Sequence, residues 1–282
     1  MIWHCAHDLQ LEIDTKPLVM GILNVTPDSF SDGGSHLTVE LALRHVQTML
    51  HDGVDIIDIG GESTRPGAEK VPTSVEIERV LPVIMRIRQF SAIPISIDTT
   101  KLEVAKAALD AGANIINDVS AFRFAPNIAQ LAKETRAGCV LMHMQGTPQT
   151  MQVDPHYENV MGEICNFFAE RIQFSLQVGL SKEQLVLDPG IGFGKRTHHN
   201  LLILKELGQL RQFGLPVLLG ASRKGLIERV TGRPIDQRLA GTLAIHCDAT
   251  SRGTAHIWRV HDVREAVDAA KMLEAILNAE IY

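Results

Sequence analysis

The chain has 282 residues, of which 45% are hydrophobic, so it is long and apolar enough to bury a substantial core. Its formal net charge of -6 supplies no basic patch of the kind that dominates affinity for nucleic acid, which argues against that class of partner. Its 4 cysteines form no C-x-x-C pair, and the chain has neither a basic leader nor a membrane-length run of about 18 apolar residues, which favours a cytoplasmic protein with reduced thiols and no membrane partner.

Residues 1–16 show weak alternation of apolar and polar side chains and could form a hairpin that covers the base of the fold. From residue 18 onward, short apolar runs recur at intervals that leave room for one helix each. The runs are LVMGIL, VDIIDI, IPISI, NIIND, CVLM, LVL, PVLL and HIWRV. Between the first two runs, residues 39–53 have helical periodicity and end at Gly53, which suits a C-terminal cap.

The last periodic segment opens with Asp262, and Glu265 three residues later resembles a capping box at the start of a terminal helix. Eight strands, each followed by a helix, predict an α/β fold, a (β/α)8 TIM barrel with a short N-terminal extension. A doubly wound sheet is the weaker alternative because no glycine-rich fingerprint opens the first unit. No linker or internal repeat divides the chain, so residues 1–282 are expected to form one domain.

Each apolar run is followed by a polar or ionisable residue. In a barrel of this type the carboxyl ends of the strands meet at one mouth, where catalytic groups gather. A single Asp or Asn at such a place could simply cap the next helix, but polar residues at every strand end indicate a functional mouth. In chain order they are Asn24, Asp58, Asp98, Asn117, His143, Asp188, Ser222 and the pair Arg259 and His261.

Asp98, Asn117 and Asp188 end the third, fourth and sixth runs. Carboxylate oxygens accept from N–H groups, and an amide both donates and accepts, so the three would suit a flat heterocycle with several N–H donors. A divalent-metal cluster or a purely structural role is the alternative, although His143 is the only histidine beside them.

Arg259 and His261 lie two residues apart, so an extended strand would project both toward the mouth. Such a pair suits an anion, especially a phosphate, to which a guanidinium donates two charge-assisted hydrogen bonds. Asn24 could join them through its carbonyl oxygen if magnesium accompanies a pyrophosphate. A structural role is the alternative for either residue taken alone.

Two glycine-rich loops follow the sixth and seventh runs. GASRKG allows a ligand close to the backbone, and its Lys224 could hold a phosphate or a ring oxygen. DPGIGFGK lacks the spacing of a nucleotide P-loop, so it is not an ATP site. Its Phe193 could stack on a ligand or be a partly buried hydrophobic residue.

Taken together, the motifs resemble those of the dihydropteroate synthase family in the same order, over roughly residues 17 to 278. The matching segments are MGILNVTPDSFSDGG, DIGGESTRPGA, SIDT, NDVS, LVLDPGIGFGK, GASRKG and RVHDV. The resemblance implies a transferase of folate biosynthesis that joins 4-aminobenzoate to 6-hydroxymethyl-7,8-dihydropterin pyrophosphate and releases pyrophosphate. It also implies a sulfonamide target, a Mg2+ cofactor and a homodimer.

The resemblance further implies roles for individual residues. The pterin would be bound by Asp98, Asn117, Asp188 and Lys224. Pyrophosphate would be bound by Arg259 and His261, with Asn24 on its magnesium ion. Thr64 and Arg65 of GGESTRPG would act beside pyrophosphate and aminobenzoate, with Phe193 and Ser222 around the amine. The catalytic set is Thr64, Arg65, Lys224, Arg259 and His261, with no covalent intermediate.

Two loops would close over the mouth in that family. Pro66 would help enclose the amine, and Asp28, Ser29, Phe30 and Asp32 would lie in the first loop, where a solvated surface loop is the alternative for Asp28 and Ser29. The reaction would be dissociative, with pyrophosphate leaving before the amine attacks. The rival readings are a methyltetrahydrofolate-binding methyltransferase domain, which would not need STRPG or RVHDV, and a paralogue that binds a ligand without catalysis.

Three segments depart from the family pattern. AFRFAPNI follows the fourth run where a glycine pair is common, and RTHHN replaces a threonine close behind the GFGK lysine. The segment HCDATSRGTAHIW is more polar than its usual alanine-rich counterpart. The last difference puts the dimer surface in doubt more than the site.

Overall fold

A computed structural model describes the whole chain except residues 15, 27–34, 64–66, 68–69 and 280–282. Eight parallel strands form a barrel in which consecutive strands from β3 to β8 pair with one another, and β10 pairs with both β3 and β9. A bridge between Leu187 and Val217 joins the two edge strands and closes the barrel. The strands are β3 (Leu18–Asn24), β4 (Ile56–Gly60), β5 (Ile95–Asp98), β6 (Ile115–Asp118), β7 (Gly138–Met142), β8 (Leu185–Asp188), β9 (Leu218–Leu219) and β10 (Ile257–Val260).

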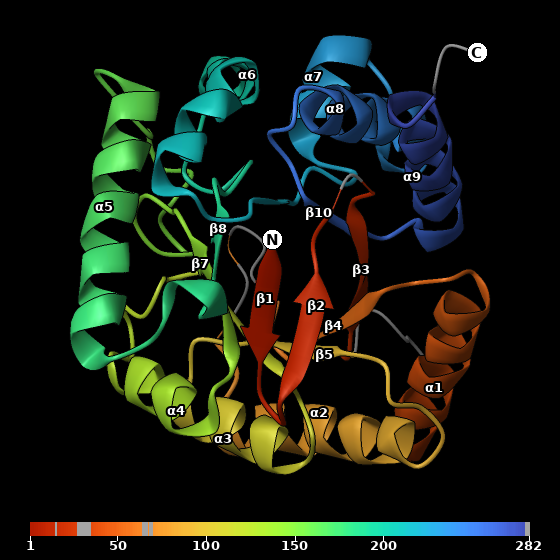
Figure 1. Cartoon of the computed structure of the whole chain (residues 1–282). Coiled ribbons are helices and arrows are strands. Elements are labelled where there is room, and N and C mark those ends of the chain that lie inside the picture. Colours follow the sequence, from red (N-terminus) through yellow and green to blue (C-terminus); the bar gives the residue numbers. More distant parts are fainter. Residues whose placement is uncertain (15, 27–34, 64–66, 68–69, 280–282) are drawn as a thin grey trace.

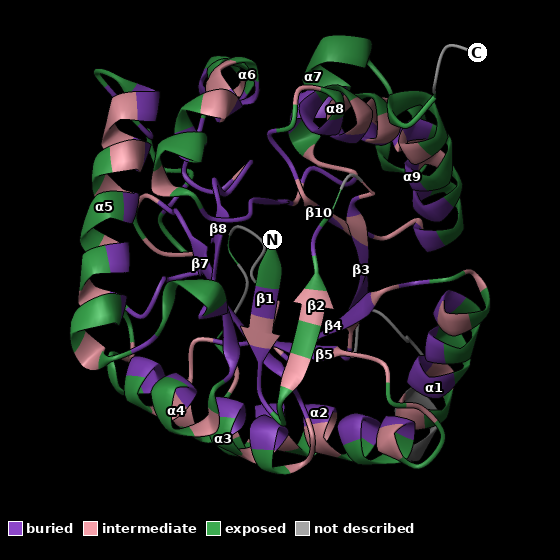
Figure 2. Ribbon diagram, viewed as in Figure 1, coloured by how far each residue is buried: buried purple, intermediate pink, exposed green. Residues whose placement is uncertain are grey.

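Helices surround the barrel as an outer ring, as Figure 1 shows. Their buried faces point toward the strands and their exposed faces point outward (Figure 2), which is the pattern of amphipathic helices packed on a sheet. They are α1 (Ser35–His51), α2 (Thr73–Arg88), α3 (Leu102–Asp110), α4 (Asn127–Thr135), α5 (Val160–Val178), α6 (Thr197–Glu206), α7 (Gly225–Thr231), α8 (Leu239–Ser251) and α9 (Val263–Leu277). The predicted α/β barrel is therefore confirmed.

The N-terminal segment forms an antiparallel hairpin of β1 (Ile2–Cys5) and β2 (Leu9–Glu12), which lies across the ring in Figure 1. Trp3, Cys5 and Ile13 pack in one cluster with the first inward-facing residues of the strands. Those residues are Met20, Ile56, Ile115, Val140, Val186, Leu218 and Ile257. The indole nitrogen of Trp3 donates to the carbonyl of Gln184 at 2.9 Å. The base of the barrel is thus a closed apolar plug.

Side chains alternate along each strand, as the pleat requires. In β10, Trp258 and Val260 pack outward into the main core, so Arg259 between them faces the barrel interior. The same alternation turns Asp58 of β4 and Asn117 of β6 inward. Above the apolar base, the interior therefore becomes polar, and this upper half positions the site.

Helix α9 begins where predicted, but the prediction of a capping box at its start is wrong. Asp262 is the N-cap residue of α9 and makes no side-chain capping hydrogen bond. Its carboxylate instead pairs with the guanidinium of Arg223 from the β9–α7 loop. The helix start is therefore fixed by an ion pair between loops. Among the described residues, none of the helices combines the length and apolarity needed to cross a bilayer.

Candidate active site

A network of buried polar side chains fills the middle of the barrel. Arg259 Nε donates to Asp58 Oδ2 at 2.6 Å, and its Nη2 donates to Asp98 Oδ2 at 2.7 Å. Asn117 Nδ2 donates to the same Asp58 oxygen at 3.1 Å. Four strands supply these side chains, and closure of the barrel brings together Asp58 and Arg259, which are 201 residues apart in the chain.

The charges of this network depend on one another. Burial lowers the pKa of Arg259, but the Asp58 and Asp98 carboxylates outweigh burial and raise that pKa, so the guanidinium stays charged. Burial raises the pKa of Asp98, and the attraction of Arg259 opposes that rise. Arg259 is therefore the counter-charge that allows two acids to lie inside the barrel.

Two oxygens of the network, and the hydroxyl of Ser96, which is paired with Asp58 in the register of β4 and β5, have no hydrogen-bond partner among the described residues. Within the described residues, Asp58 Oδ1, Asp98 Oδ1 and Ser96 Oγ are buried and make no hydrogen bond. Buried polar atoms in native proteins are nearly always paired, and leaving one unpaired costs stability. These oxygens are thus suited to accept hydrogen bonds from the N–H groups of a bound molecule.

Asp188 lies on the other side of the barrel mouth, at the end of β8. Its Oδ1 accepts from the backbone N–H of Gly190 at 2.7 Å, while its Oδ2 would lie 3.8 Å from a Cβ added to Gly220. Burial raises the pKa of Asp188, and the Gly190 hydrogen bond, Lys224 and Arg259 oppose that rise. One oxygen is thus held by the protein, and the other faces the glycine of the β9 loop.

Lys224 and Phe193 form a cation–π pair at the mouth. Lys224 Nζ lies 4.2 Å from the centroid of the Phe193 ring. Phe193 also belongs to a small apolar cluster with Val119, Met142, Met144 and Met151. The mouth therefore has one apolar wall next to its acids and cations, as a site for an aromatic ligand requires.

His261 and Ser222 are joined at the end of β10. The Ser222 hydroxyl lies 3.0 Å from His261 Nδ1 and accepts from the His261 backbone N–H at 3.1 Å. Burial, together with Arg259 and Arg223, lowers the pKa of His261 to about 4. The imidazole is therefore neutral at pH 7 in this state.

Asn24, the expected magnesium ligand, ends β3 beside Asp98. A Cβ added to Gly60 would lie 3.9 Å from Asn24 Oδ1 and 3.6 Å from Asp98 Cβ. Among the residues that the structure describes, no three His, Cys, Asp or Glu side chains form a metal-binding group. The amide oxygen of Asn24 fits Mg2+ as a single protein ligand, because this ion prefers oxygen and usually keeps waters and phosphate oxygens around it.

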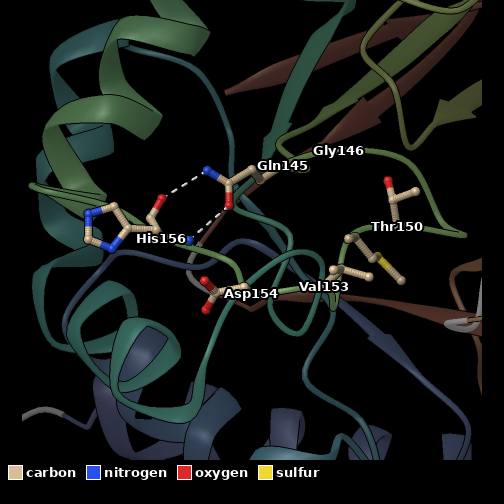
Figure 3. A pocket seen from close by; sticks show the side chains of 7 residues that line it. Gln145, Gly146, Thr150, Val153, Asp154 and His156 are labelled. Atoms are coloured by element: carbon tan, nitrogen blue, oxygen red, sulfur yellow. Dashed lines mark hydrogen bonds between the residues drawn. The ribbon is translucent and has the colours of Figure 1, made fainter.

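A separate hollow lies beside the mouth, on the β7–α5 loop. Figure 3 shows Gln145 donating to the carbonyl of His156 at 2.9 Å and accepting from its N–H at 3.2 Å. Thr150, Val153 and Asp154 complete this lining together with Gly146 and Met151. Met151 also belongs to the apolar cluster of Phe193, so the loop backs the apolar wall of the mouth.

Comparisons with known proteins identify the family of this chain. The family described as "Pterin binding enzyme" matches residues 20–261. The dihydropteroate synthase of Escherichia coli (strain K12) is 47% identical over 266 residues, which cover 94% of this chain and 94% of that protein. The chain belongs to the dihydropteroate synthase family. Members of this family are transferases.

Two solved structures of the dihydropteroate synthase family match almost the whole fold. The Yersinia pestis enzyme with a sulfonamide drug complex has a TM-score of 0.91 at 43% identity, covering 99% of this chain and 100% of that one. The Xanthomonas albilineans enzyme with 4-aminobenzoic acid has a TM-score of 0.92 at 45% identity, with coverage of 99% and 100%. The (β/α)8 barrel is thus the fold of the family.

The structure gathers most of the predicted residues at one mouth. Asp98, Asn117 and Arg259 share one network, and Lys224 lies on Phe193. Arg259, which was assigned to pyrophosphate, forms ion pairs with Asp58 and with Asp98, which was assigned to the pterin. The residues assigned to the two ligands are therefore in direct contact. Thr64, Arg65, Pro66, Asp28, Ser29, Phe30 and Asp32 lie outside the described residues.

Two strand-end residues differ from expectation. His143 does not face the mouth: its ring packs edge-on against Phe167 of α5, with centroids 4.9 Å apart, because Met142 holds the inward position. Asp58 was counted among the strand ends but given no role, although it contacts both Arg259 and Asn117. The signal for it was an aspartate flanked by the isoleucines of the run VDIIDI.

Proposed function

We propose that the chain condenses 6-hydroxymethyl-7,8-dihydropterin pyrophosphate with 4-aminobenzoate and releases pyrophosphate, in folate biosynthesis. The observation that carries the proposal is the buried network of Arg259 with Asp58 and Asp98, whose remaining oxygens have no partner among the described residues. A pterin ring carries several N–H donors on one edge, so it would satisfy these oxygens together. Family membership supports the same reaction.

The pterin would lie across the barrel mouth. Asp98 and Asn117 would bind its amino edge from one side, and Asp188 would bind from the opposite side through the oxygen that Gly190 does not hold. Lys224 would donate to the ring oxygen. Carboxylates on both sides would also stabilise positive charge that develops on the ring.

Pyrophosphate would bind next to Arg259 and His261. Arg259 supplies a permanent positive charge. His261 is neutral in this state, so it would donate a hydrogen bond first, and the arriving anion would raise its pKa. Asn24 would hold Mg2+, which, when bound, neutralises negative charge on pyrophosphate oxygens.

The displacement would be dissociative. As the C–O bond to pyrophosphate breaks, negative charge grows near Arg259 and positive charge grows on the pterin beside Asp98 and Asp188. Both changes are stabilised by fixed charges, so catalysis is electrostatic and needs no protein nucleophile. The amine of 4-aminobenzoate would then attack the exposed methylene carbon and lose a proton.

The aminobenzoate would lie against the apolar wall. Phe193 and Ser222 would flank its ring, and Lys224 on the Phe193 ring would link this position to the pterin. Thr64 and Arg65, which lie outside the described residues, complete the proposed set. Sulfonamides would compete at the same position, and a Yersinia pestis relative is known with such a drug.

We also propose a homodimer in the cytoplasm. Large apolar side chains are exposed on α6 and α9, including Leu201, Leu202, Met272 and Ile276, and neighbouring copies would cover them. The cysteines in the described residues are free thiols, as expected in a reducing compartment. The molar mass, measured by light scattering as the protein leaves a size-exclusion column, tests the dimer. The mass of a monomer at micromolar concentration would contradict it.

The deciding experiment is a two-substrate assay. Purified protein with magnesium, the pterin pyrophosphate and 4-aminobenzoate should yield dihydropteroate and one pyrophosphate for each turnover. Omission of either substrate is the control. Tight binding of the pterin without any product would instead identify a ligand-binding paralogue, and the proposal would be abandoned.

A further inference from the structure

Lys195 is a buried lysine next to the candidate active site. The proposed reaction gives it no role. It is 1% exposed, and its ammonium donates to three backbone carbonyls. The distances from Nζ are 3.1 Å to His143 O, 2.9 Å to Gly190 O and 2.9 Å to Phe193 O. An ammonium group has three protons, so all its donors are satisfied by the backbone.

Two of these carbonyls belong to the turn that carries substrate-binding groups. Gly190 accepts from Lys195 through its carbonyl and donates through its N–H to Asp188 Oδ1 at 2.7 Å. Phe193, the residue of the third carbonyl, carries the ring on which Lys224 lies. One buried amino group therefore contacts the backbone on both sides of the turn between Asp188 and Phe193.

The remaining carbonyl belongs to a residue just after a different strand. His143 follows β7, so its contact with Lys195 ties the end of β7 to the β8–α6 turn. The backbone of Gly190 lies very close to the backbone of His143. A Cβ added to Gly190, whose φ is +68°, would be 2.0 Å from His143 O. No residue with a side chain fits there, so the turn is pressed directly against β7.

The outer side of the turn is held by other side chains. Gln152 donates to Gly192 O at 2.8 Å, and the Tyr157 hydroxyl donates to Gly194 O at 2.8 Å. Asn200 Oδ1 accepts from the Gly192 N–H at 2.8 Å. These contacts would keep the turn folded without Lys195, whereas the carbonyls of Gly190 and Phe193 face the ammonium.

We propose that Lys195 is a positioning residue that sets the orientation of both Asp188 and Phe193, and so couples the pterin-binding carboxylate to the aromatic wall of the amine site. The proposal rests on the proposed function for the names of the two ligands. It goes beyond that function because Lys195 touches neither ligand. It acts only through the backbone carbonyls of His143, Gly190 and Phe193.

The test compares Lys195→Met with Lys205→Met, an exposed lysine on α6. Calorimetry measures the Kd of 6-hydroxymethylpterin, and the two-substrate assay gives KM for 4-aminobenzoate and kcat. Lys195→Met should raise both the Kd and the KM about tenfold, since small misplacement of binding groups is costly, while kcat at saturation falls far less. Lys205→Met should match the wild type in all three.

A purely structural role would give a different result. In that case Lys195→Met would lower the melting temperature while the Kd and the KM stay at wild-type values, and the proposal would be overturned. If Lys195→Met does not fold, Lys195→Gln is the second variant, because its shorter, uncharged side chain has two N–H protons and cannot hold all three carbonyls. A folded Lys195→Gln protein that binds both ligands as the wild type does would overturn the proposal equally.

A double-mutant cycle separates the two halves of the proposal. With Phe193→Leu already present, Lys195→Met should raise the KM for 4-aminobenzoate by about twofold or less, because the ring it orients is gone. Equal effects in both backgrounds would overturn the link to Phe193. If the wild type binds 6-hydroxymethylpterin but forms no product, the proposed function fails while the calorimetric test of Lys195 still decides this proposal.

Discussion

The two ends of the barrel interior are equally buried but chemically opposite. At the base, Trp3 and Ile56 are 0% exposed and lie in an apolar cluster. Nearer the mouth, Asp58 and Ser96 are also 0% exposed, yet each carries an oxygen that has no hydrogen-bond partner in the part of the chain that the structure describes. Burial at the base removes apolar area from water and stabilises the fold, whereas burial near the mouth costs free energy.

The comparison shows why one barrel can separate stability from recognition. The strands run from an apolar layer to a polar layer within a few residues, as from Ile56 to Asp58 in β4. Arg259 limits the cost of the polar layer by pairing with two acids. Changes at the base should therefore alter stability alone, and changes near the mouth should alter both stability and activity.

Arg259→Met should have the largest combined effect on stability and activity. It removes the cation that pairs with both Asp58 and Asp98, so the free energy of unfolding should fall by about 3 kcal/mol. Loss of transition-state charge stabilisation should lower kcat/KM about thousandfold. Urea unfolding and steady-state kinetics measure the two losses, and Arg259→Lys, which keeps the charge, is the control.

The pH dependence of the same variant sharpens this prediction. Without Arg259, the pKa of Asp98, already raised by burial, should rise further. A carboxyl with a raised folded-state pKa favours the folded state at low pH and loses that contribution as pH rises through its folded-state pKa. The variant should therefore lose more stability at alkaline pH than at acidic pH. Equal losses would show that the acids do not depend on Arg259.

Trp3→Ala tests the opposite end of the barrel. It empties a fully buried site and removes the hydrogen bond to Gln184, so the free energy of unfolding should fall by about 3–5 kcal/mol. At temperatures where the variant stays folded, kcat/KM should change by about twofold or less, because no catalytic group is moved. A large loss of kcat/KM in the folded variant would break the separation between the two ends.

His261→Gln should change how stability depends on pH. The folded-state pKa of His261 is lowered from 6.5 to about 4, so its stabilising contribution is present above 6.5 and is lost as pH falls toward 4. This single group accounts for at most about 3 kcal/mol of the free energy of unfolding that is lost at acid pH. The variant should therefore lose less stability between neutral pH and pH 4 in urea titrations. Parallel curves for both proteins would contradict a neutral, partly buried His261.

The sequence predicted the barrel because two simple regularities coincide. Short apolar runs mark buried parallel strands, and the polar residues that follow them mark the mouth. What it could not give is the direction of each side chain at a strand end. His143 turns outward because Met142 takes the inward position, a shift of one residue along the pleat.

The partners of the charged side chains also could not be predicted from the sequence. Asp262 has the position of a helix cap but pairs with Arg223, and Lys195 looks like a loop lysine but binds three carbonyls. In AFRFAPNI, where the family commonly has a glycine pair, Ala121 and Phe122 adopt φ of 51° and 67°. The Asp118 carboxylate accepts from the Phe122 N–H at 2.8 Å, which holds this left-handed turn without glycine.

Arg136→Gly should have the smallest effect, and it lies outside the barrel interior. Arg136 is the C-cap of α4 at φ 56°, a left-handed conformation that costs about 1–2 kcal/mol for residues with a side chain. Its ion pair with Asp8 is highly exposed and contributes little. Because glycine also gains freedom in the unfolded chain, the net gain in free energy of unfolding should be about 0.5 kcal/mol.

Urea unfolding measures this gain, and Arg136→Ala, which keeps the strain, is the matched control. The Gly variant should be more stable than the Ala variant, while both keep the wild-type kcat/KM. This follows because Arg136 precedes β7 at the base side of the barrel, where a backbone change reaches neither Asp58 nor Arg259. A change in kcat/KM would mean that the base influences the mouth through β7, and the division between the two ends would have to be redrawn.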